Sequence, residues 1–258
     1  MRGPARWRAR TRTDLEGVAC AVVRVVGLHR YPVKSLQGEA LAAAEIGPRG
    51  ILGDRAFGLR DAVTGTVLTG RRDPLVLFGT GRLDGEGGAR VTLPDGTETA
   101  DDEAISGWIG RPVRLVAAPE EPSTYETQAD PLDDASEVVA WQGPPGTFHD
   151  SRRTQVSIVA TGDLGAWDVR RFRPNVVVEA DTADVLVGRT VRLGTARLEV
   201  VKQIDRCVMV TRPQPGGLER DLDVFRRVRD ERGTFLAVGA MVLEPGRVAV
   251  GDELVIEG

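Results

Sequence analysis

Short apolar runs separated by glycine, proline and acidic residues recur along the chain from about residue 18 onwards. The first, VACAVVRVVGLHRYPV, is rich in β-branched residues and predicts a strand. A hairpin is predicted around residues 62–65, between GILGDRAFGLRD and GTVLTGRR. Further runs of the strand type are LVLFGTGRL, ARVTLPDG, RPVRLVAA, TQVSIVAT, NVVVEA, TVRLG, ARLEVVKQI, CVMV and the closing GTFLAVGAMVLEPGRVAVGDELVIEG. Many short strands with frequent turns predict a barrel or a sandwich.

Helical signals are confined to three short segments. A short helix is predicted over residues 102–109. Residues 161–163, TGD, are typical of a cap before a helix in LGAWDVRR. In LERDLDVFRRVR, residues 218–229, apolar positions repeat at helical spacing, with acidic residues early and arginines late, as the helix dipole favours. Alternation in this last segment also allows a strand.

Two segments interrupt the pattern and divide the chain. Residues 1–17, MRGPARWRARTRTDLEG, lack apolar periodicity and a secretory h-region, so we interpret them as a disordered tail or an over-called start; a nucleic-acid-binding arm is the alternative. Residues 119–150 are rich in proline, aspartate and glutamate and predict a linker or mobile loop. The expected folded regions are therefore 18–118 and 151–258.

Composition narrows the class of protein. The 258 residues are 41% hydrophobic and 28% charged, as in a globular protein with one large domain or two small ones. A formal net charge of -4 gives no support for nucleic-acid binding, and no apolar run approaches the roughly 20 residues of a membrane span. Two cysteines make no disulfide framework, so we expect a cytoplasmic protein, and two histidines exclude a multi-histidine metal site.

Cys207 is the residue with the most chemical potential. It lies between Asp205-Arg206 and the apolar run that begins at Val208. One interpretation is a structural cysteine at the start of a buried strand. The other is a thiolate, favoured by the neighbouring arginine and by the glycine-rich turn PQPGG that follows, where backbone N–H groups can face an anion. A thiolate among cations is a soft ligand in an anion-binding cleft.

Six motifs together resemble a known family. YPVKSL, LGDRAF, TGRRDP, RFRPNVVVE, DRCVMVT and PGRVAVGDEL occur in the order found in molybdenum cofactor sulfurase C-terminal (MOSC) domain proteins. The resemblance covers about residues 20–258. It implies a mainly β (α+β) fold, in which an N-terminal β-barrel-like region over 18–118 and a β-barrel MOSC core over 151–258 are accompanied by a few short helices. Among relatives, the chain is similar to the amidoxime-reducing components.

The resemblance also implies a cofactor, the molybdenum–molybdopterin group, and the residues that hold it. Cys207 stands where relatives have their molybdenum ligand and catalytic cysteine. The pterin phosphate needs charge-assisted donors, and the pterin already supplies sulfur to the metal, so one soft protein sulfur suffices. Gly239 departs from relatives, which have an aromatic residue near the cofactor. The positions that match pterin-binding residues are Lys34, Ser35, Arg55, Arg173, Asn175 and Arg206, with Arg71 and Thr154 matching less securely.

The implied activity is reduction of an N-hydroxylated small molecule by oxygen-atom abstraction at the cysteine-ligated molybdenum. Asp54 and Asp205 are candidates for the general acid. The sequence has neither a cysteine-rich cluster motif nor a Gly-x-Gly-x-x-Gly after a strand, so we expect an external electron donor, a ferredoxin or a flavoprotein. A non-catalytic carrier of the cofactor or of sulfur is the alternative, and a catalytically silent barrel is a third possibility. The sequence names neither the substrate nor the reductase.

Overall fold

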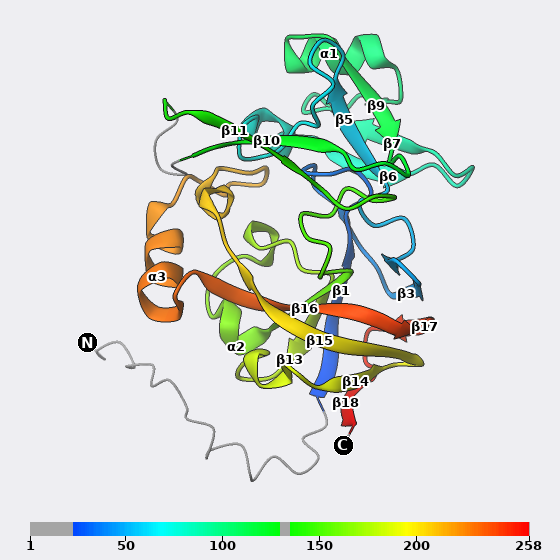
Figure 1. Cartoon of the computed structure of the whole chain (residues 1–258), viewed down its shortest axis with the longest axis vertical. Coiled ribbons are helices and arrows are strands. Elements are labelled where there is room, and N and C mark those ends of the chain that lie inside the picture. The colour runs from blue at the N-terminus through cyan, green and yellow to red at the C-terminus, as the bar shows by residue number, and fades with distance from the viewer. Residues whose placement is uncertain (1–22, 130–134, 258) are drawn as a thin grey trace.

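A closed β-barrel forms the lower half of the molecule in Figure 1. The computed structural model describes residues 23–129 and 135–257, so the tail predicted for residues 1–17 lies outside the described residues. The barrel strands are β1 (Val23–Arg30), β12 (Val156–Ala160), β13 (Val176–Glu179), β14 (Thr190–Leu193), β15 (Ala196–Asp205), β16 (Phe235–Glu244) and β18 (Glu253–Glu257). Their order is β13-β12-β16-β15-β14-β18-β1, and pairing of β1 with β13 closes the ring. The mainly β fold and the barrel core are thus confirmed.

The barrel joins distant parts of the sequence. β1 comes from the segment expected to belong to the N-terminal region, yet it pairs with β13 and β18. Only β12 and β13 run parallel; the other neighbours in the ring are antiparallel. The barrel interior is filled by aliphatic side chains such as Val25, Ile158 and Leu198, all inaccessible to solvent or nearly so. This packing supplies the rigid base from which the loops at one end project.

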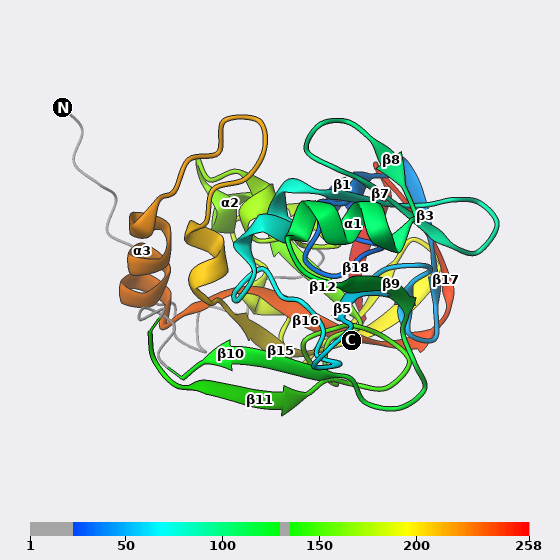
Figure 2. The same cartoon turned by 90° about the horizontal axis from the view of Figure 1, so that it is seen from above.

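Smaller sheets extend the fold beyond the barrel. β5 (Phe57–Asp61) pairs with β9 (Val113–Ala117), and β6 (Thr80–Leu83), β7 (Ala89–Thr92) and β8 (Glu98–Thr99) form a second sheet. β3 (Ala43–Gly47) lies between β4 (Gly50–Ile51) and β17 (Gly246–Ala249), while β2 (Glu39–Ala40) pairs with β1. The remaining strands are β10 (Thr124–Gln128) and β11 (Val138–Gln142). Figures 1 and 2 show β5 and β9 stacked with α1 (Asp102–Ile109) at the end away from the barrel.

The helix predicted over 102–109 and the helical interpretation of the third segment are confirmed. Asp101 caps α1 by accepting a hydrogen bond from the Ala104 N–H, and Gly110 ends the helix in a left-handed conformation. α3 (Leu222–Arg232) begins after Asp221 and ends at Gly233 in the same way. Its apolar face, which includes Val224, Phe225 and Val228, packs against one side of the barrel. No helix among the described residues is long and apolar enough to cross a membrane.

Three local predictions are wrong. The helix expected in LGAWDVRR lies earlier, as the one-turn α2 (Thr161–Leu164), and only Val169–Arg171 of that run is helical, as a 3-10 turn. CVMV is not a strand: Val208–Thr211 is a 3-10 helix, in which the Thr211 hydroxyl donates to the Val208 carbonyl at 2.7 Å. LVLFGTGRL begins as a 3-10 helix because Pro74 fixes the backbone at its first position. A further 3-10 helix in the described part of the chain is Asp184–Leu186.

Part of the segment expected to be a linker forms a hairpin. β10 and β11 pair antiparallel over their whole lengths, and Tyr125 stacks on Trp141 with ring centroids 4.4 Å apart. Tyr125 also packs with Val67 and Phe148 in a small buried cluster. The hairpin therefore lies against the body of the protein (Figure 1). The acidic and proline-rich composition of 119–150 predicts a linker, but the aromatic residues within this segment pack the hairpin in place.

Candidate functional site

Two arginines flank one buried aromatic ring where the barrel meets the N-terminal sheets. The guanidinium carbons of Arg55 and Arg173 lie 4.6 and 4.3 Å from the centroid of the Tyr31 ring. Arg55 is also ion-paired with Asp54, whose side chain is 0% exposed, and it donates to the Arg173 carbonyl at 3.1 Å. The Tyr31 N–H donates to the second oxygen of Asp54 at 2.8 Å. The Asp54 carboxylate and the Tyr31 ring thus stabilise two cations that come from loops distant in the sequence.

Arg173 and Arg206 retain donors without partners. Arg173 donates to the Leu36 carbonyl at 2.6 Å, and Arg206 donates to the Leu236 and Phe172 carbonyls at 2.6 and 2.9 Å. Burial lowers the pKa of each guanidinium to about 10, so both remain charged at neutral pH. Nη1 of Arg173 and Nη2 of Arg206 have no hydrogen-bond partner within the described part of the chain. Unpaired buried donors are costly, and an anionic ligand would satisfy them.

Lys34 is buried, while its carboxylate partner is exposed. Nζ of Lys34 donates to the Phe148 carbonyl at 2.9 Å and to Asp150 Oδ1 at 2.7 Å, and it lies 4.4 Å from the centroid of the Tyr125 ring. The Lys34 side chain is 5% exposed and that of Asp150 is 81% exposed. Burial lowers the pKa of Lys34, although Asp150 opposes the effect. Burial also lowers the pKa of His149 to about 4, so that ring is neutral at physiological pH.

Cys207 lies directly beside a further arginine. Its side chain is half-buried and free, and the residue immediately precedes the 3-10 helix Val208–Thr211. The Arg71 guanidinium interacts electrostatically with Cys207 and donates to Thr127 Oγ1 at 2.7 Å. Burial alone would lower the pKa of Arg71, but Cys207 and the carboxylates of Asp150 and Asp205 outweigh it and raise the pKa. With Arg206 adjacent in sequence, two cations flank the sulfur.

Strained backbone is concentrated around these side chains. Among the described residues, five non-glycine residues have a positive φ, and three of them, Ser35 (67°), Arg55 (50°) and Arg173 (53°), are predicted site residues. The other two, Thr234 (78°) and Ala237 (80°), flank the strand segment whose Leu236 carbonyl accepts from Arg206. Such conformations cost on the order of 1 kcal/mol each and persist where the surrounding structure imposes them, often at functional sites.

Ser35 and Thr154 have supporting positions. Ser35 Oγ accepts a hydrogen bond from the Gly70 N–H at 3.0 Å, which ties the Lys34 loop to the loop that carries Arg71. Thr154 Oγ1 is buried without a partner among the described residues. A Cβ added at Gly239 would lie 2.4 Å from this oxygen, so an aromatic residue at 239 would have to displace Thr154.

The structure does not give Asn175 a ligand-facing position. Its Oδ1 accepts from the N–H and hydroxyl of Ser157 at 3.1 and 2.9 Å, and its Nδ2 donates to the His29 carbonyl at 3.3 Å. The residue is 1% exposed. Asn175 thus joins β12, β13 and β1 at the closure of the barrel.

We expect Asn175→Ala to lower the free energy of unfolding by about 2–4 kcal/mol, because the buried Ser157 N–H and hydroxyl lose their acceptor. Chemical denaturation measures this change. Asn175→Asp, which keeps an acceptor oxygen, should retain more stability and is the control. Unchanged stability with loss of a bound ligand would instead assign Asn175 to the binding site.

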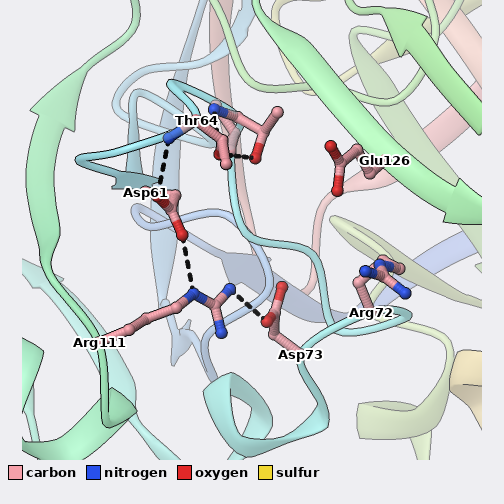
Figure 3. A pocket seen from close by; sticks show the side chains of 8 residues that line it. Asp61, Thr64, Arg72, Asp73, Arg111 and Glu126 are labelled. Atoms are coloured by element: carbon pink, nitrogen blue, oxygen red, sulfur yellow. Dashed lines mark hydrogen bonds and ion pairs between the residues drawn. The ribbon is translucent and has the colours of Figure 1, made fainter. Parts of the chain in front are cut away.

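A separate cavity lies behind the loop that carries Arg71. Its volume is about 360 Å³, and Figure 3 shows Arg111 between Asp61 and Asp73 in its wall, with Arg72 and Glu126 nearby. Arg111 donates to these carboxylates at 2.8 and 2.5 Å. Consecutive arginines of the loop thus have different surroundings: Arg71 contacts Cys207, whereas Arg72 lines this cavity.

Five residues near the cationic side chains are outside the predicted cofactor-binding set, although Asp54 is predicted as a candidate general acid. Asp150, Tyr31, Asp54, His149 and Tyr125 all contact or flank the cationic side chains. Asp54 and Tyr31 lie within or beside matched motifs, so proximity in sequence could have indicated them. Tyr125, His149 and Asp150 lie in the segment whose composition predicts a linker, and only tertiary structure brings them to Lys34.

The predicted residues fit an anionic, phosphate-bearing cofactor. Lys34, Arg55, Arg173 and Arg206 form what we call the cationic cluster, in which two guanidinium nitrogens lack partners. A half-exposed thiol lies next to it, with Arg71 on its other side. Guanidinium groups suit phosphate, and a thiol suits a soft metal. Asn175 differs from the cationic residues, because its amide oxygen and nitrogen both bond to residues of barrel strands, Ser157 and His29.

Comparison with known proteins identifies the family. A family model described as the MOSC N-terminal beta barrel domain matches residues 22–138, and one described as the MOSC domain matches residues 145–255.

No curated protein matches the chain in sequence. Among solved structures, the YuaD protein from Bacillus subtilis is 12% identical, with coverage of 91% of this chain and 95% of that chain and a TM-score of 0.42. YiiM from Geobacillus stearothermophilus is 14% identical over 55% and 72% of the two chains, with a TM-score of 0.35. The two family models together span nearly all of the described residues, and the chain therefore belongs to the MOSC domain proteins that carry an N-terminal MOSC β-barrel domain.

Proposed function

We propose that this protein holds the molybdenum cofactor between the cationic cluster and Cys207 and uses it to reduce N-hydroxylated small molecules. MOSC domains are associated with the molybdenum cofactor. The observation that carries the proposal is the meeting of an accessible thiol with Arg71, Arg206 and two unpartnered guanidinium nitrogens. This combination offers one soft metal ligand beside a phosphate site, which is what a pterin-bound metal needs from its protein.

Each group has a defined task under this proposal. Arg173, Arg206 and Lys34 would supply charge-assisted hydrogen bonds to the pterin phosphate, and Arg55 orders Arg173 by donating to its carbonyl. Cys207 provides the protein sulfur for the metal, and the two flanking cations compensate its negative charge. The bound group supplies two-electron redox chemistry and the capacity to accept an oxygen atom.

The structure separates the two candidate general acids. Asp54 is fully buried and is engaged by Arg55 and by the Tyr31 N–H, so it has neither solvent contact nor a free oxygen for substrate. Asp205 is exposed and ends β15, two residues before Cys207. We therefore favour Asp205, or water, as the proton source and assign Asp54 to the ordering of Arg55.

The test of this function is turnover. Purified full-length protein, loaded with cofactor, is supplied with a chemically reduced dye and an N-hydroxylated amidine, and the reduced amidine is quantified. Product formed in proportion to protein supports the proposal. Molybdenum without turnover would favour the carrier function, and no molybdenum under cofactor-replete expression would favour a catalytically silent barrel.

We also expect the protein to be inactive with NADH or NADPH alone. Reducing an N–O bond takes two electrons, and the sequence has no glycine-rich dinucleotide motif and no cysteine-rich cluster motif through which to receive them. Addition of a ferredoxin or a flavoprotein reductase should restore turnover with the same nucleotide. The assay compares the three mixtures under argon; turnover with nucleotide and no second protein would contradict the expectation.

A further inference from the structure

Asp150 places a negative charge directly beside Lys34 of the cationic cluster. Its carboxylate accepts from Lys34 at 2.7 Å, yet its own side chain is 81% exposed. It raises the pKa of Arg71, Arg173 and Arg206 electrostatically, although burial has the larger effect on each of them. Asp150 is exposed, whereas the cations around it are buried. Its carboxylate therefore lies where an anion bound to these cations would lie.

Lys34 has few alternatives to this partner. Apart from Asp150, its ammonium group contacts the Phe148 carbonyl and the face of the Tyr125 ring, neither of which carries a full negative charge. Within the described residues, the Asp150 side chain hydrogen-bonds only to Lys34. The carboxylate can therefore rotate into solvent when a stronger anion arrives, without breaking other contacts.

We propose that Asp150 is a specificity-determining residue, an internal counter-ion that a ligand phosphate must displace from Lys34. This inference rests on the proposed function, because it takes the cationic cluster as the phosphate site. A monoanion that replaces Asp150 exchanges one carboxylate-like contact for another and gains little. A phosphate dianion brings more charge and further acceptor oxygens for the unpartnered nitrogens of Arg173 and Arg206. Competition from Asp150 thus prevents weakly binding anions from occupying the site at Lys34.

The neighbouring cationic side chains keep the Asp150 carboxylate ionised. The positive charges of Lys34, Arg55 and Arg71 lower the pKa of Asp150 to about 2. The carboxylate is therefore ionised throughout the range in which the protein is assayed. Competition with a ligand anion is a constant feature of the site and requires no change of protonation.

The experiment measures binding of inorganic pyrophosphate to cofactor-free full-length protein by isothermal titration calorimetry. Asp150→Asn should bind pyrophosphate about 10-fold more tightly than wild type, because Lys34 becomes available for a charge-assisted hydrogen bond. Asp205→Asn is the matched control: it removes the same charge close to Cys207 but releases no lysine, so its gain should stay below about 3-fold. In a Lys34→Met background, Asp150→Asn should give no more gain than the control.

Equal or weaker binding by Asp150→Asn would overturn the inference and show that the carboxylate orients Lys34 for the ligand. A full gain in the Lys34→Met background would overturn it too, since the effect would then be general electrostatics. The two proposals fail separately. If wild-type protein carries molybdenum but Asp150→Asn binds pyrophosphate no more tightly, only the inference about Asp150 fails. Tighter binding by Asp150→Asn in a protein that never acquires molybdenum leaves a phosphate site and removes the proposed function.

Discussion

Cys207→Ser is expected to lower turnover of an N-hydroxylated amidine at least about 100-fold, since changes in groups that only support a metal ligand already cost about 10- to 100-fold. Serine is nearly isosteric with cysteine but offers a hard oxygen in place of a soft sulfur. The fold should be unaffected. Cys207 is half-buried and precedes the 3-10 helix Val208–Thr211, a position that serine tolerates well. Thermal unfolding should therefore shift by no more than about 2 °C.

The same variant separates the two interpretations of the cysteine. A core-filling residue would lose stability on substitution and leave any activity of the folded fraction intact. A metal ligand would lose activity and keep its stability. Steady-state turnover and calorimetric unfolding, measured on one preparation, distinguish them; wild-type turnover by Cys207→Ser would end the ligand assignment.

Arg71→Met is expected to weaken retention of the molybdenum cofactor by about 10- to 150-fold, the range that one charge-assisted hydrogen bond gives. Methionine keeps the apolar stem of the side chain but removes the guanidinium that contacts Cys207 and Thr127. The loop itself should stay in place, because Asp73 remains paired with Arg111 and the Gly70 N–H with Ser35. Retention is measured as molybdenum that remains after dialysis.

Arg72→Met is the matched control for this change. It removes the same charge from the next residue of the same loop, but Arg72 lines the separate cavity of Figure 3. It should retain cofactor as wild type does. Equal losses in both variants would show that net charge, and not the contact with Cys207, governs retention. Arg55 is a poorer choice, because its removal would leave the fully buried carboxylate of Asp54 without its cation.

The strands and two of the three helical predictions followed from local pattern. β-branched runs such as VVVE and VSIVA form buried barrel strands, and the acidic caps and terminal glycines of α1 and α3 act as their positions predict. CVMV also contains β-branched valines, but Val208–Thr211 forms a 3-10 helix. Its Thr211 hydroxyl satisfies the Val208 carbonyl, and its Met209 packs near Gly70 of the Arg71 loop. Tertiary contacts therefore override strand propensity at this site.

The motifs predicted most of the residues of the candidate site, but not the contacts between them. Lys34, Arg55, Arg173 and Arg206 could be placed together only through the resemblance, since single arginines in this chain are ordinary surface residues. The resemblance also placed Asn175 among them, whereas its hydrogen bonds to Ser157 and His29 close the barrel. Asp150 left no signal in the sequence, because a carboxylate in an acidic segment has nothing to mark it as the partner of a buried lysine 116 residues away.

We propose above that Cys207 and the cationic cluster hold a molybdenum cofactor. The most direct measurement is the content of molybdenum, by elemental analysis, and of pterin, by fluorescence of its oxidised form, in wild-type protein produced in cofactor-replete cells. We predict both in equal amounts, close to the amount of protein, and both absent when the host cannot make the cofactor. Wild-type protein that is folded and carries neither metal nor pterin in cofactor-replete cells would contradict the claim.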